Sequence, residues 1–263
     1  MGRSRYYSWA VLDVEDWSGR PAVNAANIQR ALQRIQTQAL TRADIDPARV
    51  ARQPRGDGAI LALPGDVAKE LITTQFVEAL REAVLEHDAD CAPEESIRIR
   101  LSLHAGDAID GEGEWAGQSV IVASRLVDSA VIKRVLAASG RSPLALIISG
   151  DWYNAVVKEG HASSEGYREV WVTEKTFSGL AWVKVPGRTR PPGVLPEDDP
   201  SRHRDDMLDD ATAPRGGRGR RAESYVDKSV HNTNVVRDST IKGDVVFGNK
   251  YGDTKSRSHG GEP

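Results

Sequence analysis

The chain has 263 residues, a formal net charge of −3 and 39% hydrophobic residues, which are ordinary values for a soluble globular protein. The charge excludes a general affinity for nucleic acid, and no apolar run is long enough to span a bilayer. The single cysteine, Cys91, excludes an internal disulfide, and the first residues lack the apolar core of a signal peptide. We therefore expect a cytoplasmic protein without nucleic-acid or membrane partners.

The first ninety residues alternate strand-like and helical patterns. Residues 6–14 are aromatic and β-branched, as in a buried strand, and residues 23–40 carry an apolar stripe at helical spacing. Two short strands, 50–53 and 59–63, flank a turn-rich segment and predict a β-hairpin. A second helix should follow Pro64 and Gly65, because apolar residues four apart share one face. The stripes of the two helices are Ile28, Leu32, Ile35 and Ala39, and then Ile72, Phe76, Leu80 and Val84.

The next hundred residues continue the mixture. Residues 97–103 alternate apolar and polar side chains, as a half-buried strand does, and 117–138 has the period of one helix. A strand at 144–149, a helix capped by Asp151 and an antiparallel pair at 170–173 and 180–185 complete the pattern. These elements predict an α/β sandwich of the α+β kind, with one sheet and helices largely on one face. Neither GxxxxGK[ST] nor GxGxxG is present, so phosphate binding would have to use metal, basic side chains and turn amides.

The composition changes near residue 187, which divides the chain. Residues 5–187 are expected to form one domain, and 188–223 is too rich in Pro, Asp, Arg and Gly to fold, so it is interpreted as a disordered linker. Short β-prone pieces recur in 224–251, separated by Asn, Asp and Gly, which suits stacked β-arcs. This segment resembles C-terminal amyloid-like signalling motifs. It is therefore either an assembly motif that contacts an effector protein or an unstructured tail, and 252–263 is expected to be disordered.

Two aspartates stand where an apolar strand meets a turn. Asp13 ends the first strand and Asp57 lies in the turn of the expected hairpin. If the two strands are neighbours, the carboxylates form an oxygen-rich site for a hard divalent cation and a nucleotide phosphate chain. If they are not, both residues are ordinary turn-forming acids.

Four segments in series resemble the catalytic domain of class III adenylate and guanylate cyclases. They are Leu-Asp-Val-Glu-Asp-Trp-Ser at 12–18, Gly-Asp at 56–57, Ile-Arg-Leu-Ser-Leu-His-Ala-Gly at 99–106 and Gly-Gln-Ser-Val-Ile-Val-Ala-Ser-Arg-Leu at 117–126. Each segment alone is weak, but together they follow the family order. The resemblance implies the ferredoxin-like class III cyclase fold.

The resemblance also implies roles for particular residues. Asp13, Asp57 and the backbone carbonyl of Val14 would hold Mg²⁺ or Mn²⁺, which would bridge the triphosphate of a ribonucleoside triphosphate. Arg125 would contact the phosphate in the transition state, because a guanidinium matches phosphoryl oxygens. Since family members build each site from two subunits, a homodimer with shared active sites is implied.

The base-binding half departs from the family pattern. The resemblance places Trp17 and Ser18 in the first loop, and Gln53 and Glu114 at the base-reading positions, where Gln53 replaces a lysine. Ile121 stands where the family has an asparagine that orients the ribose. The chain looks like a divergent member that resembles bacterial antiphage pyrimidine cyclases.

Two functions from different classes remain open on the sequence. One is a metal-dependent cyclase that makes a 3′,5′-cyclic nucleotide and pyrophosphate, with cyclic CMP or cyclic UMP as an antiphage signal. The other is an inactive cyclase-like nucleotide-binding or scaffold module that signals through its C-terminal motif.

Overall fold

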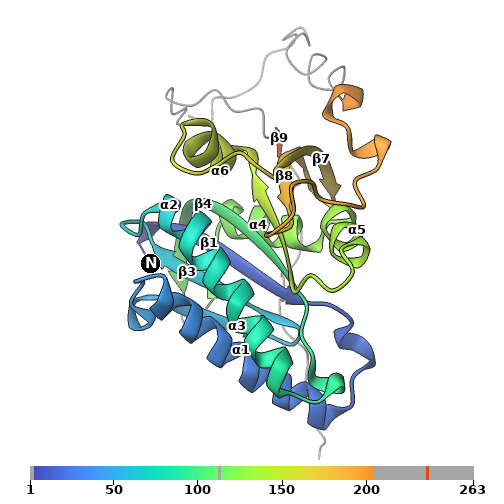
Figure 1. Ribbon diagram of the computed structural model, residues 1–263. Helices are drawn as coiled ribbons and strands as arrows, with labels where there is room; N and C mark the ends of the chain where they lie inside the picture. The colour runs from blue at the N-terminus through green and yellow to red at the C-terminus, as the bar shows by residue number, and fades with distance from the viewer. Residues whose placement is uncertain (1–2, 112–113, 204–234, 237–263) are drawn as a thin grey trace, which may run out of the picture.

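The computed structural model describes residues 3–111, 114–203 and 235–236 (Figure 1). The expected motif at 224–251 lies outside these ranges apart from Val235 and Val236, and so do most of the expected linker and the whole tail. Among the helices that can be described, none is long and apolar enough to cross a membrane.

The strands form one sheet in the order β2-β3-β1-β4-β6-β8-β7, with β5 beside the end of β4 and β9 beside β8. Among the strands that the structure describes, β4 and β6 pair in parallel and every other pair is antiparallel. The strands are β1 (Ser4–Val14), β2 (Ala51–Arg55), β3 (Gly58–Pro64), β4 (Ile99–Gly111), β5 (Glu114–Ala116), β6 (Leu144–Ser149), β7 (Arg168–Glu174), β8 (Phe177–Lys184) and β9 (Val235–Val236). The predicted hairpins are confirmed, and β4 runs eight residues past its predicted end.

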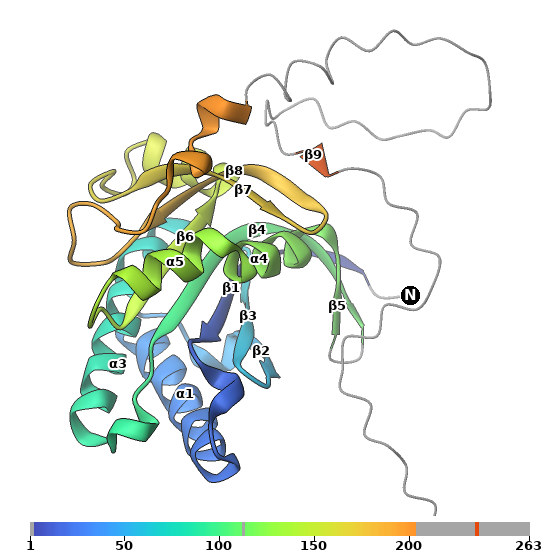
Figure 2. The same cartoon turned by 90° about the vertical axis from the view of Figure 1, so that its right-hand side faces the viewer.

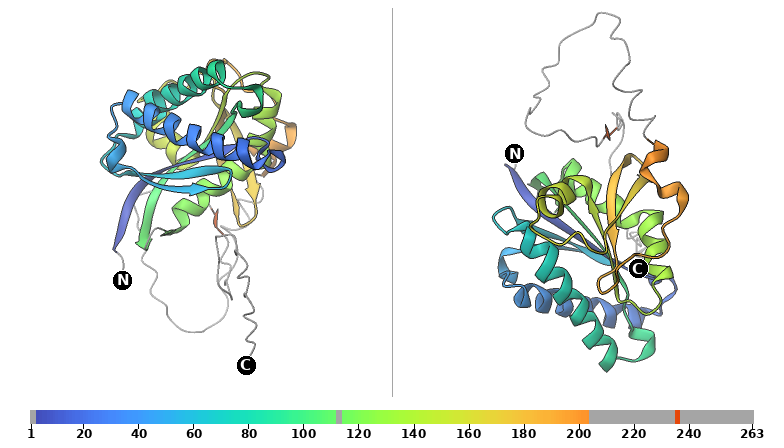
Figure 3. Two further views of the ribbon diagram at one scale, coloured as in Figure 1. Left: turned by 90° about the horizontal axis from the view of Figure 1, so that it is seen from below. Right: turned by 45° about the horizontal axis from the view of Figure 1, so that its top comes forward.

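Helices cover both faces of this sheet, so the expectation that they lie largely on one face is wrong (Figures 2 and 3). The helices are α1 (Ala22–Arg42), α2 (Lys69–Leu71), α3 (Val77–Asp90), α4 (Gln118–Asp128), α5 (Ala130–Ala138) and α6 (Gly150–Tyr153); a π-helical turn, Ile72–Phe76, joins α2 to α3. α1 and α3 pack on one face, and α4 and α5 pack on the other. The sequence carried a sign of this, because consecutive residues of β1 are apolar and both of its faces are buried.

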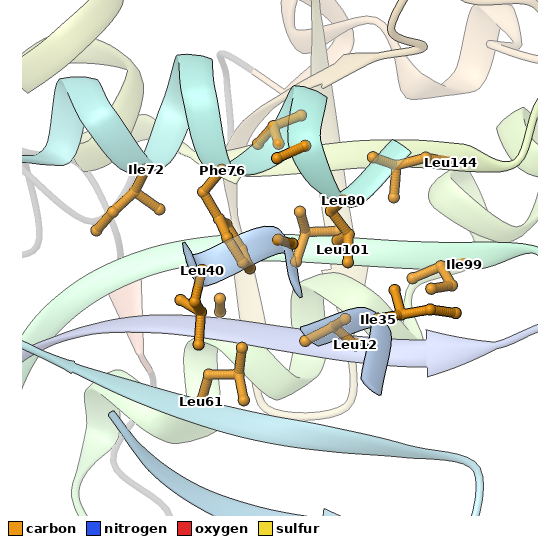
Figure 4. Close-up of a cluster of buried hydrophobic side chains, with 14 of the residues drawn as sticks. Leu12, Ile35, Leu40, Leu61, Ile72, Phe76, Leu80, Ile99, Leu101 and Leu144 are labelled. Carbon is orange, nitrogen blue, oxygen red and sulfur yellow. The ribbon is translucent and has the colours of Figure 1, made fainter. Parts of the chain in front are cut away.

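The largest core lies under α1 and α3 (Figure 4). The side chains of Leu12, Leu61 and Leu101 point from β1, β3 and β4 toward the two helices. The predicted helical stripes face them, and every member of both stripes is buried. The helical period therefore identified the buried face correctly.

The helix predicted at 117–138 is two helices that meet at Ser129. The ψ angle of this residue is 148°, which is extended, and its hydroxyl donates to the carbonyl of Leu126 at 2.8 Å. The break lets the two halves pack against separate cores: Val127 contacts β1 and β3, whereas Val131 and Val135 contact β6, β7 and β8. A side chain that satisfies its own helix end can compete with helix continuation.

Two further local predictions differ from the structure. The cap of α6 is Ser149, whose hydroxyl accepts from the amide of Trp152 at 3.2 Å, and Asp151 lies inside the first turn. Residues 188–203, expected within the linker, lie against the domain, where Asp198 is 5% exposed and pairs with Arg134 at 2.5 Å. Polar composition concealed this anchor, because an ion pair between distant residues leaves no periodic pattern in the sequence.

Candidate active site

The structure brings Asp13 and Asp57 to the same end of the sheet. Asp13 is the last but one residue of β1, and Asp57 lies in the tight turn between β2 and β3. The amide of Val14 donates to the carbonyl of Asp57 at 2.7 Å, which fixes the turn against the end of β1. The hypothesis that the two strands are neighbours is confirmed, since Asp13 is in register with Gly58.

Gly58 makes this close approach possible. A Cβ at this position would lie 1.9 Å from the carbonyl oxygen of Leu12, closer than any real contact. A residue with a side chain would therefore push β3 and its turn away from β1. The Gly-Asp-Gly sequence of the hairpin thus has a geometric reason: the glycine after Asp57 lets the turn sit against Asp13.

Asp13 is a buried carboxylate in an acidic setting. Its side chain is 12% exposed and forms an ion pair with Arg100 on β4. Burial raises the pKa of Asp13 to about 6; the Arg100 guanidinium opposes this shift, and the nearby charges of Asp57 and Asp128 add to it. Arg100 therefore offsets the desolvation of Asp13 only in part.

Arg100 pairs with Asp13, and the sequence alone did not identify it as a site residue. It lies directly opposite Asp13 in the pairing of β1 with β4. The sequence did contain a signal: Arg98, Arg100 and Ser102 alternate with apolar residues along the strand, so they share the face opposite to the α1 core. Their register against β1 was not available from one strand alone.

Arg125 lies in the last turn of α4, one turn from Ile121. Its side chain is 15% exposed, and its nearest acid is Asp128, with an N–O distance of 4.0 Å. Within the described part of the chain, the buried Nε of Arg125 has no hydrogen-bond partner. A guanidinium with a long ion pair and an unused donor is available to a further anion.

The remaining predicted site residues lie at different distances from Asp13. Trp17 is half-buried and Ser18 is exposed in a short 3₁₀ turn after β1. The Trp17 Nε1 approaches the hairpin turn, 3.9 Å from where a Cβ of Gly56 would lie. Gln53 is half-buried on β2 and pairs with Ile60, which places it on the α4 side of the sheet. These three residues flank the Asp13 end.

Glu114 is not brought together with them in one chain. It begins β5 and pairs with Gly111 at the far end of β4, eleven residues from Arg100. At roughly 3.3 Å per residue, that is roughly 36 Å along the strand. Glu114 can therefore join an Asp13 site only if that site belongs to another copy of the chain.

The donor set at the Asp13 end fits a hard divalent cation. Asp13, Asp57 and the Val14 carbonyl lie at the same end of the sheet and offer oxygen atoms, the ligand type that Mg²⁺ and Mn²⁺ bind. Burial is the main reason that the pKa of Asp13 is raised, and the charges of Asp57 and Asp128 add to it, so the ionised carboxylate is only partly compensated. A cation would provide this compensation, although it must compete with Arg100 for the Asp13 carboxylate. His104 is not part of this donor set, because its ring is buried, is hydrogen-bonded to Ser149 and lies opposite Trp9, four residues along the strand from the Asp13–Arg100 pair.

Comparisons with known proteins identify the fold. No protein-family model matches the chain, and no curated protein matches it either. A solved structure named adenylate/guanylate cyclase/hydrolase, from Silicibacter pomeroyi, is similar at 18% identity with a TM-score of 0.50, over 71% of this chain and 99% of that one. A bacterial light-regulated adenylyl cyclase is similar at 13% identity and TM-score 0.50; the match covers 72% of this chain and 54% of that chain. The predicted class III cyclase fold is therefore confirmed.

Proposed function

We propose that the protein is a metal-dependent nucleotide cyclase that converts a ribonucleoside triphosphate to a 3′,5′-cyclic nucleotide and pyrophosphate. The observation that carries the proposal is the Asp13–Asp57 arrangement, in which a backbone hydrogen bond fixes two acids at one end of a cyclase-fold sheet. The burial and raised pKa of Asp13 support it, since strongly perturbed groups concentrate at functional sites.

In this proposal Asp13, Asp57 and the Val14 carbonyl hold Mg²⁺ or Mn²⁺. Bound there, the cations supply Lewis-acid stabilisation of the triphosphate and acidify the ribose 3′-hydroxyl. The 3′-oxygen forms a bond to the α-phosphorus, the bond from that phosphorus to the bridging oxygen breaks, and the hydroxyl proton passes to solvent. Arg125 from a second copy of the chain binds the non-bridging phosphoryl oxygens, since its own chain offers its guanidinium only a 4.0 Å ion pair with Asp128.

A pyrimidine is the substrate base we propose, with cyclic CMP or cyclic UMP as an antiphage signal. Support comes from the departures at Gln53 and Ile121 and from the resemblance to pyrimidine cyclases. Gln53 presents both a donor and an acceptor, as an edge of cytosine or uracil requires. Glu114 comes from the second copy, since the two residues lie at opposite ends of the sheet.

A second candidate function is favoured by the ion pair between Arg100 and Asp13. If Arg100 holds Asp13 permanently, no cation reaches that carboxylate, and the domain is a nucleotide-binding or scaffold module that signals through residues 224–251. The two functions differ in whether added metal releases Asp13 from Arg100.

The test is an incubation of the purified full-length chain with each of the four ribonucleoside triphosphates and Mn²⁺ or Mg²⁺. We expect mass spectrometry to detect a cyclic pyrimidine nucleotide, and Asp57→Asn to lower its formation at least about 100-fold, as loss of a metal ligand does. Asp44→Asn is the matched control, because Asp44 is also an exposed turn acid but lies at the far end of α1. Absence of any cyclic product, with Asp57→Asn binding nucleotide as the wild type does, would favour the inactive module.

A further inference from the structure

A groove lined mostly by polar side chains lies between α1 and the hairpin strand β2, and its volume is about 850 Å³. Its walls come from one side of α1 and from β2, and the side chain of Arg52 crosses between them to donate to Thr37 at 2.8 Å. Gln29 closes one end, where its amide donates to the carbonyl of Gly56 at 3.2 Å. Asp13, Val14, Asp57 and Gln53 are not among the residues that line it, whereas Gly58 of the hairpin is.

The groove is on the opposite face of the sheet from Asp13. Arg52 pairs with Leu61, whose side chain belongs to the core under α1. Asp13 alternates in phase with Trp9 and Val11, which pack against α4. Because successive strand residues point to opposite faces, the sheet separates the groove from the Asp13 carboxylate.

The lining is strongly cationic although the protein is acidic. Its charged members are all arginines: Arg30, Arg34, Arg52 and Arg55. Within the described ranges none of the four forms an ion pair. Four unpaired guanidiniums in one concave surface repel one another, and an anion with several oxygens would relieve that repulsion.

Gln36 gives the groove a specific polar contact. The residue is 2% exposed overall and lines the groove, and its amide atoms are not among the fully buried atoms that lack a hydrogen-bond partner in the described part of the chain. A side-chain amide in the groove lining can hydrogen-bond a ligand that has both a donor and an acceptor.

We infer that this groove binds a free nucleotide: its phosphates contact the arginines, and its base or ribose meets the amide of Gln36. The volume is in the range of sites that hold molecules of this size. The site is separate from the proposed catalytic centre and needs no metal, so the nucleotide there is an effector rather than a substrate.

The test is titration calorimetry of the full-length chain in EDTA with a nucleoside triphosphate, inorganic triphosphate and a single-stranded oligonucleotide. The EDTA and an Asp57→Asn background remove metal-dependent binding at the other site. We expect the nucleotide to bind most tightly of the three. The double variant Arg34→Gln/Arg52→Gln should lower the affinity for the nucleotide at least about tenfold, since each substitution removes a charge-assisted contact. Gln36→Leu should weaken the nucleotide but leave inorganic triphosphate unchanged.

Arg42→Gln is the matched control, because Arg42 lies on the same helix but outside the groove, where it pairs with Glu86 at 2.8 Å. It should bind as the wild type does, and thermal unfolding checks that every variant is folded. The inference is overturned if no phosphate compound binds, or if the double arginine variant binds normally. Equal binding of inorganic triphosphate and nucleotide, or tighter binding of the oligonucleotide, would also overturn it.

Discussion

Replacing Asp13 by asparagine should abolish activity but increase stability at neutral pH. The pKa of this carboxyl is about 6 in the folded chain against an ordinary value of 3.8. Between these values the folded state keeps a proton that the unfolded state has lost, so folding stability falls as pH rises from about 4 to 6. At pH 7 the folded protein carries the whole free-energy cost of an ionised, buried Asp13. A neutral asparagine of the same shape removes this cost.

The magnitude follows from the size of the shift. A difference of about 2.2 pKa units corresponds to about 3 kcal/mol at 1.36 kcal/mol per unit. Partial access of solvent to the carboxylate reduces this value, so we expect Asp13→Asn to raise the free energy of unfolding by about 1–2 kcal/mol at pH 7. The opposing contribution of Arg100 is already contained in the net shift.

Urea unfolding of wild type and Asp13→Asn at pH 4 and pH 7 measures this effect. The two proteins should be similarly stable at pH 4, and the variant should be the more stable at pH 7. Asp66→Asn is the control, because the pKa of Asp66 is shifted in the opposite direction: the hydrogen bond from Arg49 lowers it. This variant should not be more stable than the wild type at pH 7. A loss of more than about 1 kcal/mol in Asp13→Asn at pH 7 would show that the Arg100 ion pair outweighs the burial cost.

Gly58→Ala should lower the melting temperature and the cyclase activity together, because the added Cβ collides with the Leu12 carbonyl. We expect the free energy of unfolding to fall by more than about 3 kcal/mol. Gly19→Ala, with no atom within 4 Å of the added Cβ, should leave both unchanged, and equal melting of the two variants would contradict the geometry. His104→Gln should remove a loss of stability that wild type undergoes as pH falls from 6.5 to about 4, since burial lowers the pKa of His104 to about 4. Urea unfolding at pH 4.5 and 7 measures it, and identical pH profiles would refute the assignment.

Local patterns in the sequence predicted the elements well because helical and strand periods report burial directly. The stripe from Ile72 to Val84 and the hairpin around Asp57 were predicted correctly for this reason. The break at Ser129 was not, since a serine hydroxyl that bonds one carbonyl leaves the apolar period on either side almost intact. The order of strands in the sheet also needed contacts between distant parts of the chain.

In the candidate site, too, local features were predictable from the sequence and contacts between distant residues were not. The neighbourhood of Asp13 and Asp57 followed from strand ends and turn chemistry, which are local. The partner of Asp13 did not, because Arg100 meets it only through the register of β1 with β4, eighty-seven residues apart in sequence. The anchoring of residues 188–203 likewise depends on contacts between distant parts of the chain: Asp198 with Arg134, Arg188 with Ser139, and His203 with Trp171.

Mixing two inactive variants tests the central claim most directly, because it requires both the metal half and the arginine half of one proposed site. Asp57→Asn and Arg125→Ala should each be inactive alone. In an equal mixture, half of the dimers combine both variants and hold one intact site of two, so about one quarter of the wild-type rate of cyclic nucleotide formation should return. Full inactivity of the mixture, with wild type active and mixed dimers detected, would contradict a site shared between Asp57 of one copy and Arg125 of the other.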